Sequence, residues 1–214
     1  MDKNKLYEES QYIIDTFLET PIELIDVNEW KGSNIVIIDM INGFAKTGNL
    51  YSNRVEKIIE NTQKVLSMLD SSEHLFLCDS HSNESVEFQT FLPHCTIDTE
   101  ETEIVDELKE WSDKGRIFKK NSTNGFIEPE FQAWLSKNRN PRYLVVGCCT
   151  DLCVLQFVLS LKTHYNRINQ PCEIMVIENA VETYHVNEIN HPGDFMHLIS
   201  LKMLKDNGIL LGRI

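Results

Sequence analysis

The chain has 214 residues, of which 42% are hydrophobic and 25% charged, a composition typical of a soluble globular protein. This length suits one sizeable α/β domain, although two small domains would also fit. Its 33 acidic and 20 basic side chains give a formal net charge of −13. A nucleic-acid backbone or an anionic membrane needs basic patches on its partner, so we expect neither as a partner.

The N-terminal segment carries charges throughout and lacks the continuous apolar stretch of a signal peptide. No apolar run approaches the ~20 residues that span a bilayer, so a cytoplasmic location is the default expectation. Thiols stay reduced in that compartment, which argues against disulfides. The cysteines also form no Cys-x-x-Cys pair, which argues against a structural zinc site; they are Cys78, Cys95, Cys148, Cys149, Cys153 and Cys172.

The order of apolar and amphipathic segments predicts the fold. Helical spacing of apolar residues predicts a helix over 4–18, which we expect to pack on the main body or on a partner subunit. After it, short apolar runs predict strands at 34–40, 74–79, 116–119, 143–148 and 173–178. The amphipathic stretches predict helices at 53–69, 102–112, 128–137, 151–165 and 194–206. This alternation indicates an α/β fold with a mostly parallel sheet covered on both faces.

Parallel sheets place functional sites beyond the carboxyl ends of their strands, so the residues that close each run are candidates. Asp39 closes the first run; a carboxylate there is costly to bury without a partner, and a cap or turn role is the alternative. Lys119 and Lys120 close the third run. They face opposite ways in extended chain, so one can enter a site while the other is solvated. A solvated lysine is the alternative for either.

The second run ends in a possible metal-binding segment. Asp79 and His81 project to the same side of an extended chain, and Glu87 and His94 follow in the next loop. Two imidazoles and two carboxylates suit a divalent transition metal, with coordination positions left for water. The alternative is a set of solvated loop residues.

The fourth run ends in "GCCTDLC", residues 147–153. Thr150 or Asp151 can cap the helix that follows, which places Cys153 in its first turn. There the helix dipole would lower the pKa of a thiol, and free N–H groups could bind a developing oxyanion. Cys153 is therefore the candidate nucleophile. Cys148 and Cys149, still at the strand end, are expected to be small packing residues.

Four segments, taken together in this order, resemble the isochorismatase-like cysteine hydrolases and, among them, the nicotinamidases. They are "IIDMINGF", "DSH…E…FLPHC", "KNSTNGF" and "GCCTDLC". The resemblance runs from about Asn34 to the C-terminus. It implies a three-layer α/β/α sandwich, isochorismatase-like and Rossmann-like, over 33–214, preceded by an N-terminal helical extension over 1–32.

The resemblance also implies roles for these residues. Asp39, Lys120 rather than Lys119, and Cys153 match the catalytic residues, and the N–H groups of Cys149 and Cys153 match the oxyanion hole. A cis peptide is implied between Cys148 and Cys149. One divalent metal ion is implied, zinc first with iron or manganese as alternatives, which would bind the pyridine nitrogen of the substrate. The implied metal ligands are Asp79, His81, Glu87 and His94, and the implied ring-binding residues are Phe44 and Phe91.

Some positions depart from the family pattern without removing a catalytic group. Gly43 replaces an aspartate of the first motif, and Leu92 replaces the first proline of a Pro-Pro-His sequence. Thr123 and Asn124 stand in place of a Tyr-Ser pair. These differences leave the shape of the substrate pocket open.

The expected function is hydrolysis of nicotinamide to nicotinate and ammonia through a thioester, a reaction of NAD salvage, in a homo-oligomer. Another small amide or carbamoyl compound, with the same catalytic residues, is the second reading. A homologue that binds without catalysis is the third, and the separate reactive groups Asp39, Lys120 and Cys153 argue against it. A nucleotide-binding domain is excluded because no glycine-rich phosphate motif follows the first strand.

Overall fold

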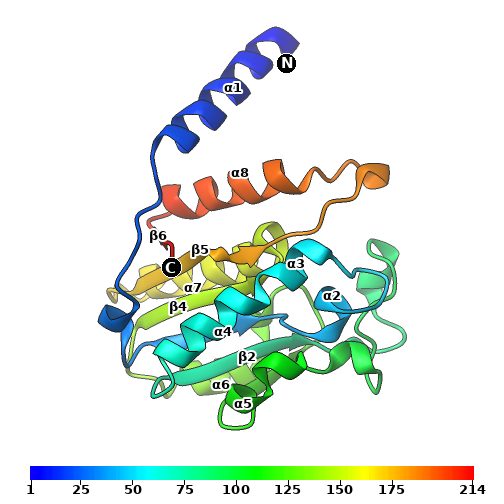
Figure 1. Ribbon diagram of the computed structural model, residues 1–214, viewed down its shortest axis with the longest axis vertical. Helices are drawn as coiled ribbons and strands as arrows, with labels where there is room; N and C mark the ends of the chain where they lie inside the picture. The colour runs from blue at the N-terminus through cyan, green and yellow to red at the C-terminus, as the bar shows by residue number, and fades with distance from the viewer.

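The computed structural model describes residues 1–214 and contains one six-stranded sheet in the order β3-β2-β1-β4-β5-β6 (Figure 1). Every strand pair is parallel. The first five strands confirm the predicted ones, whereas β6 was not predicted because its three residues are too few to show a pattern. The strands are β1 Asn34–Ile38, β2 Glu73–Asp79, β3 Arg116–Lys120, β4 Arg142–Cys148, β5 Glu173–Glu182 and β6 Leu210–Gly212.

Most helices lie where the sequence predicts them, but two differ. The predicted helix 53–69 divides at Ile58 into α3 and α4, and the predicted helix 102–112 keeps only its last turn as α5. The second difference has a cause in the backbone: Ile104 pairs with Ile41, and the N–H of Val105 donates to Met40, which holds this segment extended. The helices are α1 Lys3–Glu19, α2 Asn42–Ala45, α3 Asn53–Lys57, α4 Ile59–Met68, α5 Lys109–Ser112, α6 Pro129–Leu135, α7 Leu155–Arg167 and α8 Gly193–Asp206.

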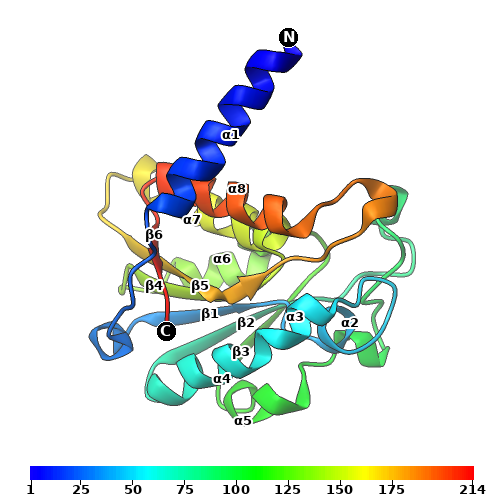
Figure 2. The same ribbon diagram turned by 45° about the horizontal axis from the view of Figure 1, so that its top comes forward.

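Two hydrophobic cores flank the sheet, as alternation along the strands requires. On β1, Ile35 and Ile37 face the core beneath α3, α4 and α5, whereas Val36 and Ile38 face the core beneath α6, α7 and α8. Figure 2 shows the two helical layers on opposite sides of the sheet. The predicted three-layer α/β/α sandwich is confirmed. None of the helices combines the length and the apolar character needed to cross a membrane.

The close approach of the ends of β1 and β4 depends on Gly147, which lies opposite Ile38 in this parallel pair. Its φ is +116°, and a Cβ atom at this position would lie 2.0 Å from the carbonyl oxygen of Ile38. Only glycine fits such a close approach with a positive φ. The next peptide bond, between Cys148 and Cys149, is cis, which confirms the prediction. This glycine brings the start of the "GCCTDLC" turn against the end of β1.

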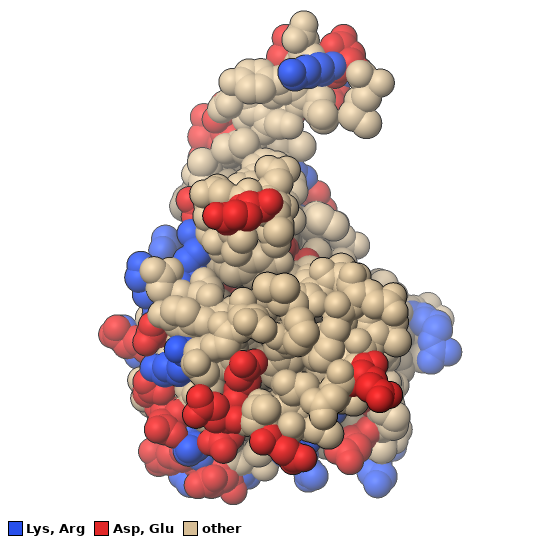
Figure 3. Space-filling view, turned by 90° about the vertical axis from the view of Figure 1, so that its right-hand side faces the viewer, with Lys and Arg blue, Asp and Glu red and all other residues tan.

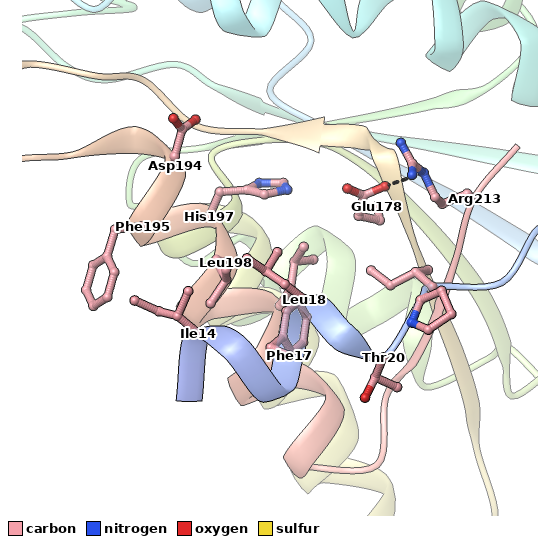
Figure 4. Close-up of a pocket in the computed structure, with 13 residues that line it drawn as sticks. Ile14, Phe17, Leu18, Thr20, Glu178, Asp194, Phe195, His197, Leu198 and Arg213 are labelled. Carbon is pink, nitrogen blue, oxygen red and sulfur yellow. Dashed lines mark ion pairs between the residues drawn. The ribbon is translucent and has the colours of Figure 1, made fainter. Parts of the chain in front are cut away.

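Helix α1 projects from the body, and none of its residues is buried (Figures 1 and 2). Asp2 caps its first turn by accepting a hydrogen bond from the N–H of Asn4. Only its C-terminal part packs on the body: Figure 4 shows Phe17 and its neighbours beside Leu198 of α8, along a groove of about 680 Å³. The expected packing of this helix on the main body therefore applies to its last turns.

Residues 21–32 belong structurally to the body. Val27 and Trp30 are buried, and the guanidinium of Arg142 lies 4.7 Å from the Trp30 ring centre. The N–H of Arg213 donates to the carbonyl of Glu23, and the segment forms a parallel bridge beside the last strand. These contacts attach the connection after α1 to the sheet.

We expect two truncations to separate α1 from this connection. A chain that begins at residue 21 should keep a free energy of unfolding within about 1 kcal/mol of the full chain, because α1 buries no side chain. A chain that begins at residue 33 loses Val27 and Trp30, and burial of each side chain is worth about 1.5–3 kcal/mol. Urea unfolding measures both; equal stability of the two truncated chains would contradict the role of residues 21–32.

Candidate active site

Three reactive side chains from separate parts of the chain meet at the carboxyl ends of the strands. Asp39 directly follows β1, Lys120 ends β3, and Cys153 lies in the turn after β4. The Nζ of Lys120 is 2.8 Å from Oδ2 of Asp39 and 3.7 Å from Sγ of Cys153. All three residues are buried. The structure thus brings together the three residues predicted as catalytic.

Lys120 and Lys119 separate as their alternation on the strand predicts. Lys119 is exposed, whereas Lys120 is buried and also contacts Oδ1 of Asp79. Burial alone would lower the pKa of Lys120, but the carboxylates of Asp39 and Asp79 hold that pKa well above its usual value. Lys120 is therefore a permanent positive charge between two carboxylates.

Asp39 occupies an unusual backbone conformation that directs its carboxylate into the site. Its φ is +53°, in the left-handed region, which costs a non-glycine residue about 1–2 kcal/mol. Oδ1 accepts a hydrogen bond of 2.8 Å from the N–H of Asp79. Apart from the ion pair with Lys120, Oδ2 has no hydrogen-bond partner. Burial and the charge of Asp79 raise the pKa of Asp39 to about 6, with Lys120 opposing them.

Cys153 corrects one expectation from the sequence. Burial and the negative charges of Asp39 and Asp79 hold the pKa of its thiol well above the ordinary value, although Lys120 opposes them. The expected lowering by a helix dipole is wrong, because desolvation in this enclosed position outweighs it. The resting nucleophile is a thiol. An adjacent base is therefore needed, and Oδ2 of Asp39 is a free acceptor beside it.

The expected helix cap is also wrong. Residues 150–154 form a single wide π-type turn without a side-chain cap, in which the N–H of Val154 donates to the carbonyl of Cys149. Thr150 and Asp151 instead point to neighbouring elements: the Thr150 hydroxyl is 3.0 Å from Nδ1 of His197, and Asp151 accepts a hydrogen bond from the hydroxyl of Thr183.

The two other cysteines of the turn are buried beside Cys153. The thiol of Cys148 donates to the carbonyl of Asp39 at 3.3 Å. The N–H of Cys149 donates to no backbone carbonyl and no side chain, so this donor is free at the pocket wall.

A set of metal-type donors lies next to the three residues predicted as catalytic. Ligand atoms of Asp79, His81 and His94 all lie within 4.8 Å of one another, and the three residues are buried. Neither ring nitrogen of His81 has a hydrogen-bond partner. Nδ1 of His94 lies 2.7 Å from the carbonyl of Leu92, which fixes its proton there and leaves Nε2 as a free electron-pair donor.

Electrostatics and composition of this set fit a divalent metal. Burial would raise the pKa of Asp79, but Lys120 and the two histidines lower it below its ordinary value, so the carboxylate is ionised. Nε2 of His81 lies 3.3 Å from Oδ1 of Asp79 without forming a hydrogen bond, and a buried imidazole that forms no hydrogen bond is costly unless a ligand completes it. These residues could hold one N/O-coordinated ion such as zinc, iron or manganese.

Glu87 stands beside this set and differs from the other three predicted ligands. Its Oε1 accepts a hydrogen bond of 2.7 Å from the N–H of Thr123, and it also contacts the Thr123 hydroxyl. Its Oε2 lies 3.5 Å from Nε2 of His81. Glu87 is therefore anchored to the loop after β3, with one oxygen turned to the histidine.

Aromatic side chains enclose a small pocket over the thiol. Phe44 and Phe91, predicted to bind a ring, both line it, and their rings lie 5.7 Å and 6.3 Å from the ring of His94. The cavity is about 20 Å³ and is also lined by Leu50, Asp79, Glu87, His94, Thr123, Cys149, Leu152, Cys153 and Tyr184. Figure 3 shows the end of the molecule where these loops lie; uncharged residues cover the centre of this face, and Asp and Glu gather toward its lower edge.

Sequence reasoning missed Leu50, Leu152 and Tyr184. Leu152 lies inside the recognised "GCCTDLC" segment, next to Cys153, and could have been predicted as a pocket residue from that position. Leu50 and Tyr184 lie in loops and carry no motif. Tyr184 follows β5, which is longer than the predicted strand 173–178 and so carries this ring to the pocket.

Comparison with known proteins identifies the family and agrees with the fold. The chain belongs to the isochorismatase family, because the family model for the isochorismatase domain matches residues 33–205. It is 29% identical to nicotinamidase 1 from Arabidopsis thaliana over 87% of each chain. Family membership and this relative make the protein an amidohydrolase.

Solved structures confirm the fold. The nicotinamidase of Bacillus subtilis superposes with a TM-score of 0.68 at 21% identity, over 85% of this chain and 99% of that chain. The pyrazinamidase of Pyrococcus horikoshii, solved in complex with zinc, gives a TM-score of 0.69 at 18% identity, over 86% and 99%. The N-carbamoylsarcosine amidase of Thermoplasma acidophilum gives 0.69 at 19% identity, over 84% and 95%.

We expect metal binding to depend on the histidines more than on Glu87. His94→Ala removes a predicted ligand nitrogen and should weaken zinc affinity at least about 100-fold. Glu87→Gln leaves the other predicted ligands in place and should weaken zinc affinity less than about 10-fold. Metal content by mass spectrometry after dialysis against buffered zinc measures this. His164→Ala, on α7 and outside the donor set, is the control. Unchanged occupancy in His94→Ala would remove this residue from the ligand set.

Proposed function

We propose that the protein hydrolyses nicotinamide to nicotinate and ammonia through a thioester on Cys153. The observation that carries the proposal is that Cys153 shares one aromatic-walled pocket with two of the metal-type donors, Asp79 and His94. Beneath this pocket, Lys120 contacts both Asp39 and Asp79. A flat heteroaromatic amide offers a carbonyl to the thiol and a ring nitrogen to a Lewis acid.

In the first half-reaction the carboxylate of Asp39 takes the proton from the Cys153 thiol as the sulfur attacks the amide carbon. The carbonyl oxygen becomes an oxyanion, which the N–H groups of Cys149 and Cys153 stabilise. Asp39 then gives its proton to the amide nitrogen, the carbon–nitrogen bond breaks, and ammonia leaves. Cys153 is left as a thioester of the pyridine carboxylic acid.

In the second half-reaction Asp39 takes a proton from a water molecule as its oxygen attacks the thioester carbon. The same N–H groups stabilise the second oxyanion. The carbon–sulfur bond breaks, the sulfur recovers the proton from Asp39, and nicotinic acid leaves and loses its proton to the solvent to give nicotinate. Lys120 keeps its charge throughout, because two carboxylates hold its pKa high, and this charge stabilises the anionic states of Asp39 and the sulfur.

Asp79, His81 and His94 would hold the metal ion, with Glu87 beside it, and zinc is the ion we propose first. When bound, the ion supplies a Lewis acid that orients a ring nitrogen. Phe44 and Phe91 supply the apolar walls for the ring. A carbamoyl compound or ureido acid lacks such a nitrogen and would leave the donor set without a role, so we propose the pyridine amide and, with it, a place in NAD salvage.

We expect metal-replete protein to release ammonia from nicotinamide, and Cys153→Ala to reduce this rate at least about 10⁴-fold, because the thioester cannot form. Zinc content and urea unfolding should stay as in the wild type. Coupled detection of ammonia measures the rate. Absence of release from zinc-, iron- and manganese-loaded protein would reject nicotinamide as the substrate, and residual turnover in Cys153→Ala near the wild-type rate would reject the nucleophile.

The acid limb of the pH profile should report Asp39. Its pKa is raised to about 6, so the carboxylate is protonated below this pH and can no longer accept the thiol proton. We expect kcat/KM for nicotinamide to fall about tenfold per pH unit below pH 6 and to level off above it. Asp39→Asn should abolish the limb together with the activity. A wild-type rate that stays constant from pH 7 to pH 5 would contradict Asp39 as the base.

A further inference from the structure

A surface hairpin between β5 and α8 carries one aromatic ring into the active-site pocket. The hairpin closes by two backbone hydrogen bonds, since the N–H of Val186 donates to the carbonyl of His191 and the N–H of His191 donates to that of Val186. Tyr184, at its base, is buried and lines the pocket with the catalytic cysteine. Residues 187–190, at its tip, are exposed. The catalytic steps use none of these residues.

His191 fixes this ring by three contacts. Its Nδ1 lies 3.0 Å from the carbonyl of Tyr184, and its Nε2 lies 2.7 Å from Oδ2 of Asp151. Both partners are hydrogen-bond acceptors, so His191 bridges the Tyr184 backbone and the Asp151 carboxylate. The imidazole ring also stacks on the Tyr184 ring, with the ring centres 4.0 Å apart and the planes 22° apart.

Asp151 ties the hairpin to the nucleophile. It lies in the same turn as Cys153, and its side chain is 3% exposed in contact with His191, whose side chain is 11% exposed. Its other carboxylate oxygen accepts a hydrogen bond from the Thr183 hydroxyl, next to Tyr184. The position of the Tyr184 ring relative to the thiol is thus set by the buried contact between His191 and Asp151 and by the hydrogen bond from Thr183 to Asp151.

The pocket is too small for an aromatic amide as it stands. Its volume of about 20 Å³ holds about one water molecule, so a wall has to move before a substrate ring can enter. Phe44 and Tyr184 are 4% and 8% exposed, and both belong to the core beneath α3 and α4. Tyr184 differs from Phe44 in that it lies at the base of a surface hairpin, where His191 and Asp151 hold it.

We propose that Tyr184 is the wall of the pocket that limits the size of the ring that reaches Cys153, with His191 and Asp151 as positioning residues. The part of this inference that concerns substrates rests on the proposed nicotinamide activity. The part that concerns access to the thiol does not, because it can be measured with a thiol reagent alone.

The access test compares a small and a bulky reagent at Cys153. Peptide mass spectrometry follows alkylation by iodoacetamide and by N-phenylmaleimide, which also separates Cys153 from the other cysteines. Tyr184→Ala and Tyr184→Leu should raise the rate with the maleimide relative to iodoacetamide at least about 10-fold, while Tyr184→Phe, which keeps the ring, should not. An unchanged ratio in the folded Ala and Leu variants would overturn the proposal.

The positioning residues have their own test. His191→Asn and Asp151→Asn should each raise the same ratio, and the double variant should add little beyond either one, because the two residues act as a pair. His185→Asn changes an exposed histidine of the same hairpin that does not line the pocket, and it should leave the ratio unchanged. Additive effects, or an equal effect of His185→Asn, would contradict the anchoring role.

Catalysis supplies a separate readout. Tyr184→Ala should raise kcat/KM for 5-methylnicotinamide relative to nicotinamide at least about 10-fold, mainly through KM, since Tyr184 donates nothing to the reacting atoms. A lower ratio than in the wild type would overturn the wall role. If the wild type hydrolyses neither amide but the alkylation ratio rises in the Tyr184 variants as described, the proposed substrate is wrong. The role of Tyr184 as a wall that limits access to Cys153 is then still supported.

Discussion

The ammonium of Lys120 between the carboxylates of Asp39 and Asp79 is the interaction on which the rest of the site depends. All three groups are buried, and each belongs to the end of a different strand. Loss of one partner from such a buried ionic set typically costs about 3–5 kcal/mol, because the remaining charges are left uncompensated. The sheet order β3-β2-β1 makes this contact possible, since it places the three strand ends side by side. The fold therefore assembles the site by strand order.

The same arrangement of charges explains why the side chains of the site differ in protonation state. Two carboxylates and burial keep the Cys153 sulfur protonated at rest, so the nucleophile depends on a base that can take its proton during attack. Asp39 meets this need because its own pKa is raised to about 6, close to neutrality. Asp79 differs, since Lys120 and two histidines lower its pKa and keep it ionised, which suits the metal-ligand role proposed for it. Neighbouring carboxylates thus take different roles because their surroundings differ.

Strand ends and local motifs were sufficient to predict most of the fold and the site. Asp39 and Lys120 lie at the ends of apolar runs, alternation placed Lys119 and Lys120 on opposite sides of the strand, and the family resemblance selected Lys120. Properties that depend on the enclosed environment could not be read from the chain: the dipole argument for the Cys153 pKa omitted desolvation. Tyr184 was missed because its role comes from a hairpin that folds back on the pocket through His191 and Asp151, contacts between residues far apart in the sequence. The short strand β6 shows no pattern of its own and forms against β5.

The central claim is that the reaction passes through an acyl group on Cys153. Acid quenching of metal-replete protein during turnover of nicotinamide, followed by peptide mass spectrometry, tests it most directly. The account predicts a pyridine-carbonyl adduct on the peptide that contains Cys153, which disappears when the substrate is exhausted. Ammonia release under the same conditions with the adduct on another residue would contradict the account. Release of ammonia without any adduct, from a variant in which hydrolysis of the thioester has been slowed, would also contradict the account.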